Sequence, residues 1–215
     1  MPADTIILVH GLWMTGIELS LLKHRLETDH GFKCVLFSYA SVTGNMLDHV
    51  AKLRELANAQ KCERLHFIGH SLGGVVSYKL LESTNDLPPG RAIFMGSPMQ
   101  GSRTLDAISK WTIGRVAVGD EVCKEVLQSE GRKWDGRRDV GIIAGSVNMG
   151  FGRFFTNEMS GSSDGTVLLE ETQLEGAADH IVLPVTHTSM VFSPLVTRQI
   201  VKFLAEGKFD HDDVK

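Results

Sequence analysis

The stretch Ile68-Gly69-His70-Ser71-Leu72-Gly73-Gly74 sets one serine among three glycines. The residues before it, Arg64 to Ile68, form a short β-prone run, and the residues after it, Val75 to Glu82, have the apolar spacing of a helix. This pattern predicts a sharp turn from a strand into a helix at Ser71. Such a turn brings the side chains two positions before and two positions after the serine into collision, so glycine is needed at both places.

Length and composition indicate a globular protein with one ordinary core. The chain has 215 residues, of which 42% are hydrophobic and 22% are charged, and these values are typical of a single α/β domain. The formal net charge of −4 gives no electrostatic reason to expect a nucleic-acid partner. The three cysteines, Cys34, Cys62 and Cys123, form no CxxC pair and no metal-ligand spacing with histidine, so we expect reduced thiols.

The first residues begin a strand at once, with Thr5 to Val9, and no basic region followed by a long apolar region precedes it. No apolar run in the sequence approaches the roughly 18 residues of a membrane span. We therefore expect a cytoplasmic protein that does not insert stably into a membrane.

Strand and helix patterns alternate along most of the chain. Strands are expected at residues 5–9, 34–39, 65–68, 92–95, 140–144 and 180–185, and helices at residues 19–26, 45–57, 73–81 and 194–204. Alternation of this kind predicts the α/β class, with a mostly parallel sheet of about six strands and helices on both faces. Residues 1–215 are expected to form one domain.

The segment 102–138 interrupts this alternation. Leu105, Ile108 and Trp111 fit one helix face, and Asp120 is expected to cap a second helix. Two interpretations are open: the segment is a small helical lid inserted over a site, or its apolar stripe packs against the sheet in the ordinary way. The narrow stripe slightly favours packing.

A charged turn closes this segment. Its basic residues alternate with acidic ones, so a solvated turn is a better interpretation than a site for an anionic substrate (Arg132, Lys133, Arg137 and Arg138).

Three reactive side chains follow three different strands. Ser71 follows the third strand, Asp164 stands near the end of the long loop after the fifth, and His187 follows the last. Because ligands bind at the carboxyl ends of the strands in parallel sheets, these side chains are expected at one edge. A serine, an acid and a histidine in this chain order have the pattern of a catalytic triad.

Other candidates for the acid and the base fit less well. Asp139 and Asp179 precede the fifth and the last strand, so both are expected at the opposite edge of the sheet. His180 opens the last strand and is interpreted as an ordinary polar residue. His70 is adjacent to the serine in the turn, so its side chain points elsewhere and it cannot be the base.

Five motifs in order resemble the α/β-hydrolase superfamily: ILVHGLW, GHSLGG, FMGSPMQGS, SSDGTV and VTHTSM. The sequence looks closest to small bacterial lipases and esterases and to the GPI-inositol-deacylase-like group. The resemblance covers almost the whole chain. It implies a minimal form of the fold, without the two leading strands of the full family sheet.

The resemblance also implies roles for particular residues. Ser71 is the nucleophile, His187 is the base, and Asp164 fixes the tautomer of His187 and stabilises the imidazolium. The backbone N–H groups of Leu12 and Leu72 bind the oxyanion, and the helix that begins after the serine directs its N-terminus at the developing negative charge.

The residues of the substrate pocket are less determined. For Trp13, Met14 and Met99, lining an acyl pocket and packing in the core are both open interpretations. His70 is expected to pack or to form a hydrogen bond near the site.

These features together predict a serine hydrolase that cleaves a small-molecule carboxylic ester through an acyl-enzyme, with no metal and no cofactor. A thioesterase, an amidase, an acyltransferase or a cofactor-free perhydrolase would use the same triad. A binding protein on a hydrolase scaffold is a further alternative, although no member of the triad is missing. The sequence specifies neither the acyl chain, nor the alcohol, nor the oligomeric state.

Overall fold

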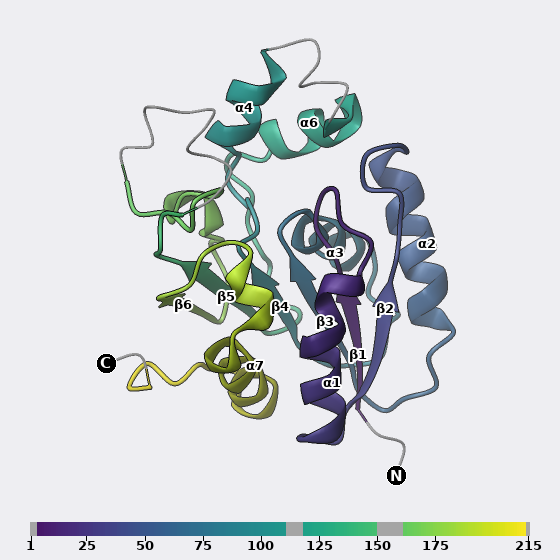
Figure 1. Ribbon diagram of the computed structural model, residues 1–215. Coiled ribbons are helices and arrows are strands. Elements are labelled where there is room, and N and C mark those ends of the chain that lie inside the picture. The colour runs from purple at the N-terminus through teal and green to yellow at the C-terminus, as the bar shows by residue number, and fades with distance from the viewer. Residues whose placement is uncertain (1–3, 111–117, 150–160, 214–215) are drawn as a thin grey trace.

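The computed structural model describes residues 4–110, 118–149 and 161–213 (Figure 1). These residues form one sheet of six parallel strands in the order β2-β1-β3-β4-β5-β6. The strands are β1 Thr5–Val9, β2 Lys33–Phe37, β3 Leu65–His70, β4 Ala92–Met95, β5 Val140–Gly145 and β6 Asp179–Leu183. The predicted fold class is confirmed.

Helices cover both faces of the sheet. They are α1 Ser20–Thr28, α2 Met46–Asn58, α3 Leu72–Ser83, α4 Arg103–Ser109, α6 Asp120–Leu127 and α7 Pro194–Glu206, with shorter 3₁₀ turns at η1 Ile17–Leu19, η3 Glu170–Thr172 and η4 Ser189–Phe192. Figure 1 shows α1 and α7 in front of the sheet and α3 behind it, and α2 packs beside α3.

The strand β1 lies between β2 and β3 and contributes apolar side chains to both faces of the sheet. Ile7 and Val9 belong to the core on the side of α2 and α3. Ile6 and Leu8 belong to the core on the side of α1 and α7. Because successive side chains of a strand point to opposite faces, a strand covered on both sides must be apolar at every position.

Polar caps fix the beginnings of several helices. The side chain of Asn45 accepts the backbone N–H of Asp48 at 2.8 Å and begins α2. The Ser193 hydroxyl accepts the N–H of Val196 at 3.4 Å, and Pro194 occupies the first helical position of α7. The last strand ends before Pro184, which has no N–H to donate to the sheet.

The segment 102–138 contains the two expected helices, α4 and α6, and Figure 1 shows both beyond the carboxyl ends of the central strands. Leu105 and Ile108 lie on α4. Trp111, the third residue of the expected stripe, lies outside the described residues.

The charged turn after α6 differs from the expectation of a fully solvated loop. The Arg132 side chain is only 7% exposed, pairs with Glu125 at 2.7 Å and lies over the ring of Tyr78. Arg138 donates to the carbonyl groups of Leu65 and Pro88, and burial lowers the pKa of its guanidinium to about 10. The expectation is therefore wrong for these two arginines, which bind other segments of the chain.

None of the helices within the described ranges combines the length and the apolarity needed to cross a bilayer.

Burial of the aromatic side chains near α7 predicts how much each one contributes to the free energy of unfolding. Phe203 is fully buried, and its ring lies 4.7 Å from that of Phe209. Phe203→Ala should lower the free energy of unfolding by about 3–5 kcal/mol because it leaves a cavity. Phe192 is 43% exposed, so Phe192→Ala should lower it by about 1 kcal/mol or less. Urea unfolding measures both, and equal losses would contradict this view of the core.

Candidate active site

Ser71 occupies the turn between β3 and α3 in a backbone conformation that serine rarely adopts. Its φ is 54° and its ψ is −123°. A non-glycine residue held in such a region costs on the order of 1–3 kcal/mol. The turn is fixed on both sides, because the N–H of Ser71 donates to the carbonyl of Met95 at 2.9 Å and its carbonyl accepts the N–H of Gly74 at 3.0 Å.

The glycines around the serine are required by close approach of the backbone. A Cβ atom on Gly69 would lie 2.4 Å from the nitrogen of Gly74, and a Cβ on Gly73 would lie 2.1 Å from the carbonyl oxygen of Val9. A Cβ on Gly74 would lie 2.0 Å from the hydroxyl of Ser97. No side chain fits at these distances, so the start of α3 packs directly against the ends of β1 and β3 only with glycine.

His187 and Asp164 form a buried pair at the same edge of the sheet. His187 Nδ1 lies 2.7 Å from Asp164 Oδ2, and the N–H of His187 donates to the carbonyl of Asp164 at 2.8 Å. An ionised carboxylate only accepts hydrogen bonds, so Nδ1 carries the proton and Nε2 of the neutral ring is left as a base. This is the tautomer that a general base next to a hydroxyl requires.

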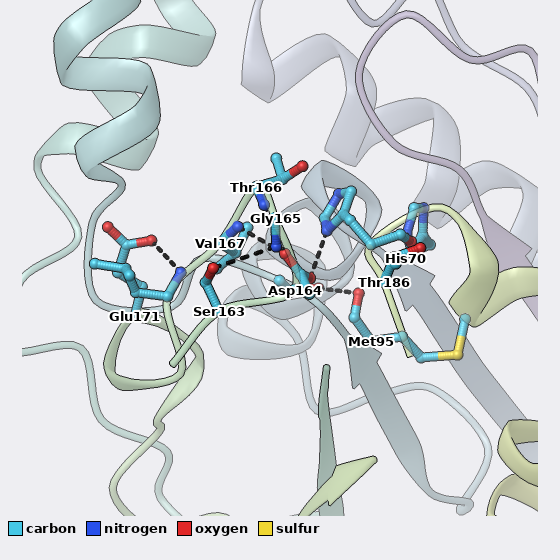
Figure 2. Close-up of polar contacts among 12 residues, drawn as sticks. His70, Met95, Ser163, Asp164, Gly165, Thr166, Val167, Glu171 and Thr186 are labelled. Carbon is cyan, nitrogen blue, oxygen red and sulfur yellow. Dashed lines mark hydrogen bonds and ion pairs between the residues drawn. The ribbon is translucent and has the colours of Figure 1, made fainter. Parts of the chain in front are cut away.

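The turn after Asp164 stabilises its negative charge. Figure 2 shows Asp164 with Thr166 and Val167, whose N–H groups donate to Oδ1 at 2.9 and 2.8 Å. Burial alone would raise the pKa of this carboxyl, but the His187 ring and the two N–H donors outweigh it and hold the pKa below its usual range. Asp164 is therefore ionised at neutral pH although it is only 1% exposed.

His70 supports His187 from behind. Its Nε2 lies 3.0 Å from the backbone carbonyl of His187, and the two rings lie 4.8 Å apart. Because that carbonyl can only accept, Nε2 of His70 donates. Complete burial lowers the pKa of His70 to about 3, so it stays neutral and keeps this hydrogen bond across the physiological range.

A cavity of about 340 Å³ opens over these residues. Both Ser71 and His187 line it. Its walls are mainly apolar, and the described residues that line it include no aspartate, glutamate, lysine or arginine. Most of the apolar side chains come from the loop after β1 and from helices α4 and α6 (Leu12, Trp13, Met14, Leu105, Ile108, Val122 and Val126).

The structure places the expected site residues in two groups. Leu12, Leu72, Trp13 and Met14 line the cavity together with the serine and the histidine. Met99 does not line it: its side chain is fully buried in the core on the α3 side of the sheet.

His70 is likewise absent from the cavity wall. Its ring is fully buried behind His187, where it packs against the His187 ring and also forms the hydrogen bond to the His187 backbone.

The rejected acids lie elsewhere, as expected. Asp139 immediately precedes β5 and pairs with Arg91 at 3.0 Å. Asp179 begins β6, accepts the N–H of Phe209 at 2.7 Å and pairs with His211. Both are at the amino ends of their strands, so neither can reach the cavity.

Glu171 is a buried carboxylate that the sequence does not reveal. Its side chain, labelled in Figure 2, is 4% exposed. It accepts the N–H of Arg103 at 2.6 Å, at the start of α4, and that of Leu168 at 2.8 Å. Burial raises the pKa of this carboxyl. Glu171 thus joins α4 to the loop that carries Asp164, and no pattern around residue 171 marks it.

Within the part of the chain that the structure describes, no cluster of three or more histidine, cysteine, aspartate or glutamate side chains could hold a metal ion.

Comparison with known proteins identifies the family. The model of the alpha/beta hydrolase family matches residues 6–194, which is most of the chain. The protein therefore belongs to the α/β-hydrolase family. No curated protein matches the sequence.

Solved structures share the fold at low sequence identity. An esterase from Exiguobacterium antarcticum superposes with a TM-score of 0.65 at 14% identity, covering 96% of this chain and 94% of that one. A lipase-esterase related protein from Clostridium acetobutylicum gives 0.64 at 11%, covering 93% and 94%. Tomato methylketone synthase I, complexed with beta-ketoheptanoate, gives 0.62 at 12%, covering 97% and 99%.

These likenesses establish the fold and leave the reaction open, because the same fold serves different chemistries. Neither the family match nor these three structures points to the GPI-inositol deacylases in particular.

The strain at Ser71 makes a prediction that does not depend on activity. Ser71→Gly and Ser71→Ala both remove the hydroxyl, but only glycine relieves the backbone strain. After allowing for the greater freedom of glycine in the unfolded chain, the glycine variant should be the more stable by about 1 kcal/mol. Urea unfolding of the two variants measures the difference. An alanine variant of equal or greater stability would show that the turn is not strained.

Proposed function

We propose that this protein is a serine hydrolase that cleaves uncharged carboxylic esters through an acyl-enzyme intermediate. The observation that carries the proposal is that Ser71, on its strained turn, and His187, oriented by Asp164, open into one cavity. A nucleophile, a base and an orienting acid around a space for substrate are the parts that acyl transfer requires.

In the first step, the ester carbonyl carbon lies next to Ser71 Oγ. Nε2 of His187 takes the hydroxyl proton while Oγ forms a bond to the carbonyl carbon, and the electrons of the carbonyl π bond move to its oxygen. Asp164 stays ionised and stabilises the imidazolium that forms.

The oxyanion is held by backbone donors. Leu72 is the first residue of α3, so its N–H has no partner within the helix and lies at the positive end of the helix dipole. Leu12 lines the cavity from the loop after β1. We assign the oxyanion to the N–H groups of these two residues, as the resemblance to the α/β-hydrolases implies.

In the second step, the bond from the carbonyl carbon to the alcohol oxygen breaks. His187 gives its proton to the leaving alcohol, and the acyl group remains on Ser71. Water then enters, gives a proton to Nε2 and attacks the acyl carbon, which releases the acid and restores the serine.

The lining and the volume of the cavity limit the polarity and the length of the acyl group that can bind. Because its described lining carries no aspartate, glutamate, lysine or arginine, an acyl chain that enters must be apolar and uncharged. The volume of about 340 Å³ is at the lower end for ligand cavities, which favours short or medium chains.

The segment 102–138 forms a cap in this proposal. Leu105 and Ile108 of α4 and Val122 and Val126 of α6 line the cavity from the side opposite the strand ends. They therefore supply the apolar surface that the acyl chain contacts.

The acid of the triad can be tested with a matched substitution at the wrong edge. Asp164→Asn should lower kcat for a p-nitrophenyl ester by about 10⁴-fold, because the amide no longer favours the tautomer with a basic Nε2. Asp179→Asn, at the amino end of β6, should leave kcat within a few-fold of the unaltered protein. Initial rates of both variants measure the effect. An inactive Asp179→Asn together with an active Asp164→Asn would show that Asp164 is not the acid of the triad.

The charge of the acyl group provides a second test. p-Nitrophenyl hexanoate and the p-nitrophenyl monoester of adipic acid have acyl chains of the same length, but only the second ends in a carboxylate. Burying that carboxylate without a partner costs several kcal/mol, so kcat/KM at pH 7 should favour hexanoate by about a hundredfold or more. Similar values for the two esters would contradict an uncharged acyl site.

A further inference from the structure

The loop after β1 has a conformation that needs external support. Trp13 has a φ of 59°, in the left-handed region that bulky residues rarely occupy, and its side chain is 51% exposed. Such a backbone persists only when its surroundings hold it. Leu12, which precedes it, carries one of the two N–H groups assigned to the oxyanion. The peptide unit between Leu12 and Trp13 adjoins the unit that carries the Leu12 N–H, so a shift of the backbone at Trp13 would also move that N–H.

The support comes from the segment that follows β2, the neighbouring strand. The backbone N–H of Trp13 donates to the hydroxyl oxygen of Ser41 at 3.1 Å. The hydroxyl of Tyr39 donates to the backbone carbonyl of His10 at 2.9 Å, and the N–H of Tyr39 donates to His10 Nε2 at 3.2 Å. Three hydrogen bonds thus join two loops that the sheet places side by side.

Both ring nitrogens of His10 form hydrogen bonds in this contact. Its Nδ1 lies 2.8 Å from the carbonyl oxygen of Gly11, which can only accept, so Nδ1 carries the proton and Nε2 accepts from Tyr39. The ring is fully buried and stacks on Tyr39 at 4.4 Å. Burial lowers the pKa of His10, which keeps this neutral tautomer. His10 therefore holds the loop in place, and both of its ring nitrogens are already hydrogen-bonded, so neither is available for proton transfer.

Ser41 is itself held firmly. It is 4% exposed, and the N–H of Thr43 donates to the carbonyl of Ala40 at 3.2 Å, which closes a turn around it. Tyr39 lies between the rings of Phe37 and His49, at 5.4 and 4.7 Å. The hydroxyl of Ser41 is therefore a fixed acceptor.

We infer that Ser41 is a positioning residue for the reaction: its hydroxyl holds Trp13 in the left-handed conformation and so directs the Leu12 N–H at the oxyanion. The inference rests on the proposed function for its chemistry. Ser41 touches no reacting atom, so its removal should act on the transition state through Leu12. Without the hydroxyl, the N–H of Trp13 loses its acceptor and the strained backbone relaxes.

Kinetics separate this role from a general loss of stability. Ser41→Ala should lower kcat for a short p-nitrophenyl ester by about tenfold to a hundredfold with little change in KM, because the misdirected donor acts mainly in the transition state. Tyr39→Phe, which removes only the hydroxyl bound to His10, should lower kcat less and also spare KM. Ser83→Ala removes a hydroxyl that donates to Leu80 at the far end of α3, and kcat should not change.

Hydrogen exchange tests the anchoring without relying on activity. In mass spectrometry of the whole protein after digestion, Ser41→Ala should speed exchange in peptides covering residues 10–16, and Ser83→Ala should not. If the unaltered protein cleaves no ester, the proposed function fails, and exchange still decides whether Ser41 holds the loop. Unchanged exchange in Ser41→Ala overturns the inference, and so does faster exchange with an unaltered kcat.

Discussion

The close approach of α3 to the end of β1 is the constraint on which the site depends. The backbone at Gly73 lies so near the carbonyl of Val9 that a Cβ would stand 2.1 Å from that oxygen. The same approach turns the chain sharply at Ser71 and brings the start of α3 beside the loop that carries Leu12. The strain at the serine, on the order of 1–3 kcal/mol, is offset by the two apolar cores that hold β1 and β3 in place.

The remaining parts of the site come from the other half of the sheet. β5 and β6 end side by side, so the loops after them bring Asp164 and His187 within 2.7 Å. Buried polar groups then hold each loop in place. His70 forms a hydrogen bond to the backbone of His187, and Glu171 links the loop that carries Asp164 to the start of α4. In the proposed mechanism, catalysis therefore depends on backbone positions that distant segments hold.

The sequence predicts the parts of this structure that follow from local rules. Strand and helix periods define the sheet, and the positions of Ser71, Asp164 and His187 after their strands place them at one edge. Contacts between remote segments escape such rules. Ser41 and Trp13 are 28 positions apart, and Arg103 and Glu171 are 68 apart. Met99 follows a strand as a pocket residue would, but its side chain packs in the core, because only the complete fold determines which way it points.

The proposed mechanism requires Ser71 to be an activated nucleophile, and reaction with a fluorophosphonate probe reports this property. Such a probe forms a stable bond only with a serine that has a base beside it and donors for the oxyanion. Intact-protein mass after reaction should show one adduct, and peptide mapping should place it on Ser71. An adduct on another serine, or no adduct on protein that cleaves an ester, would contradict the account.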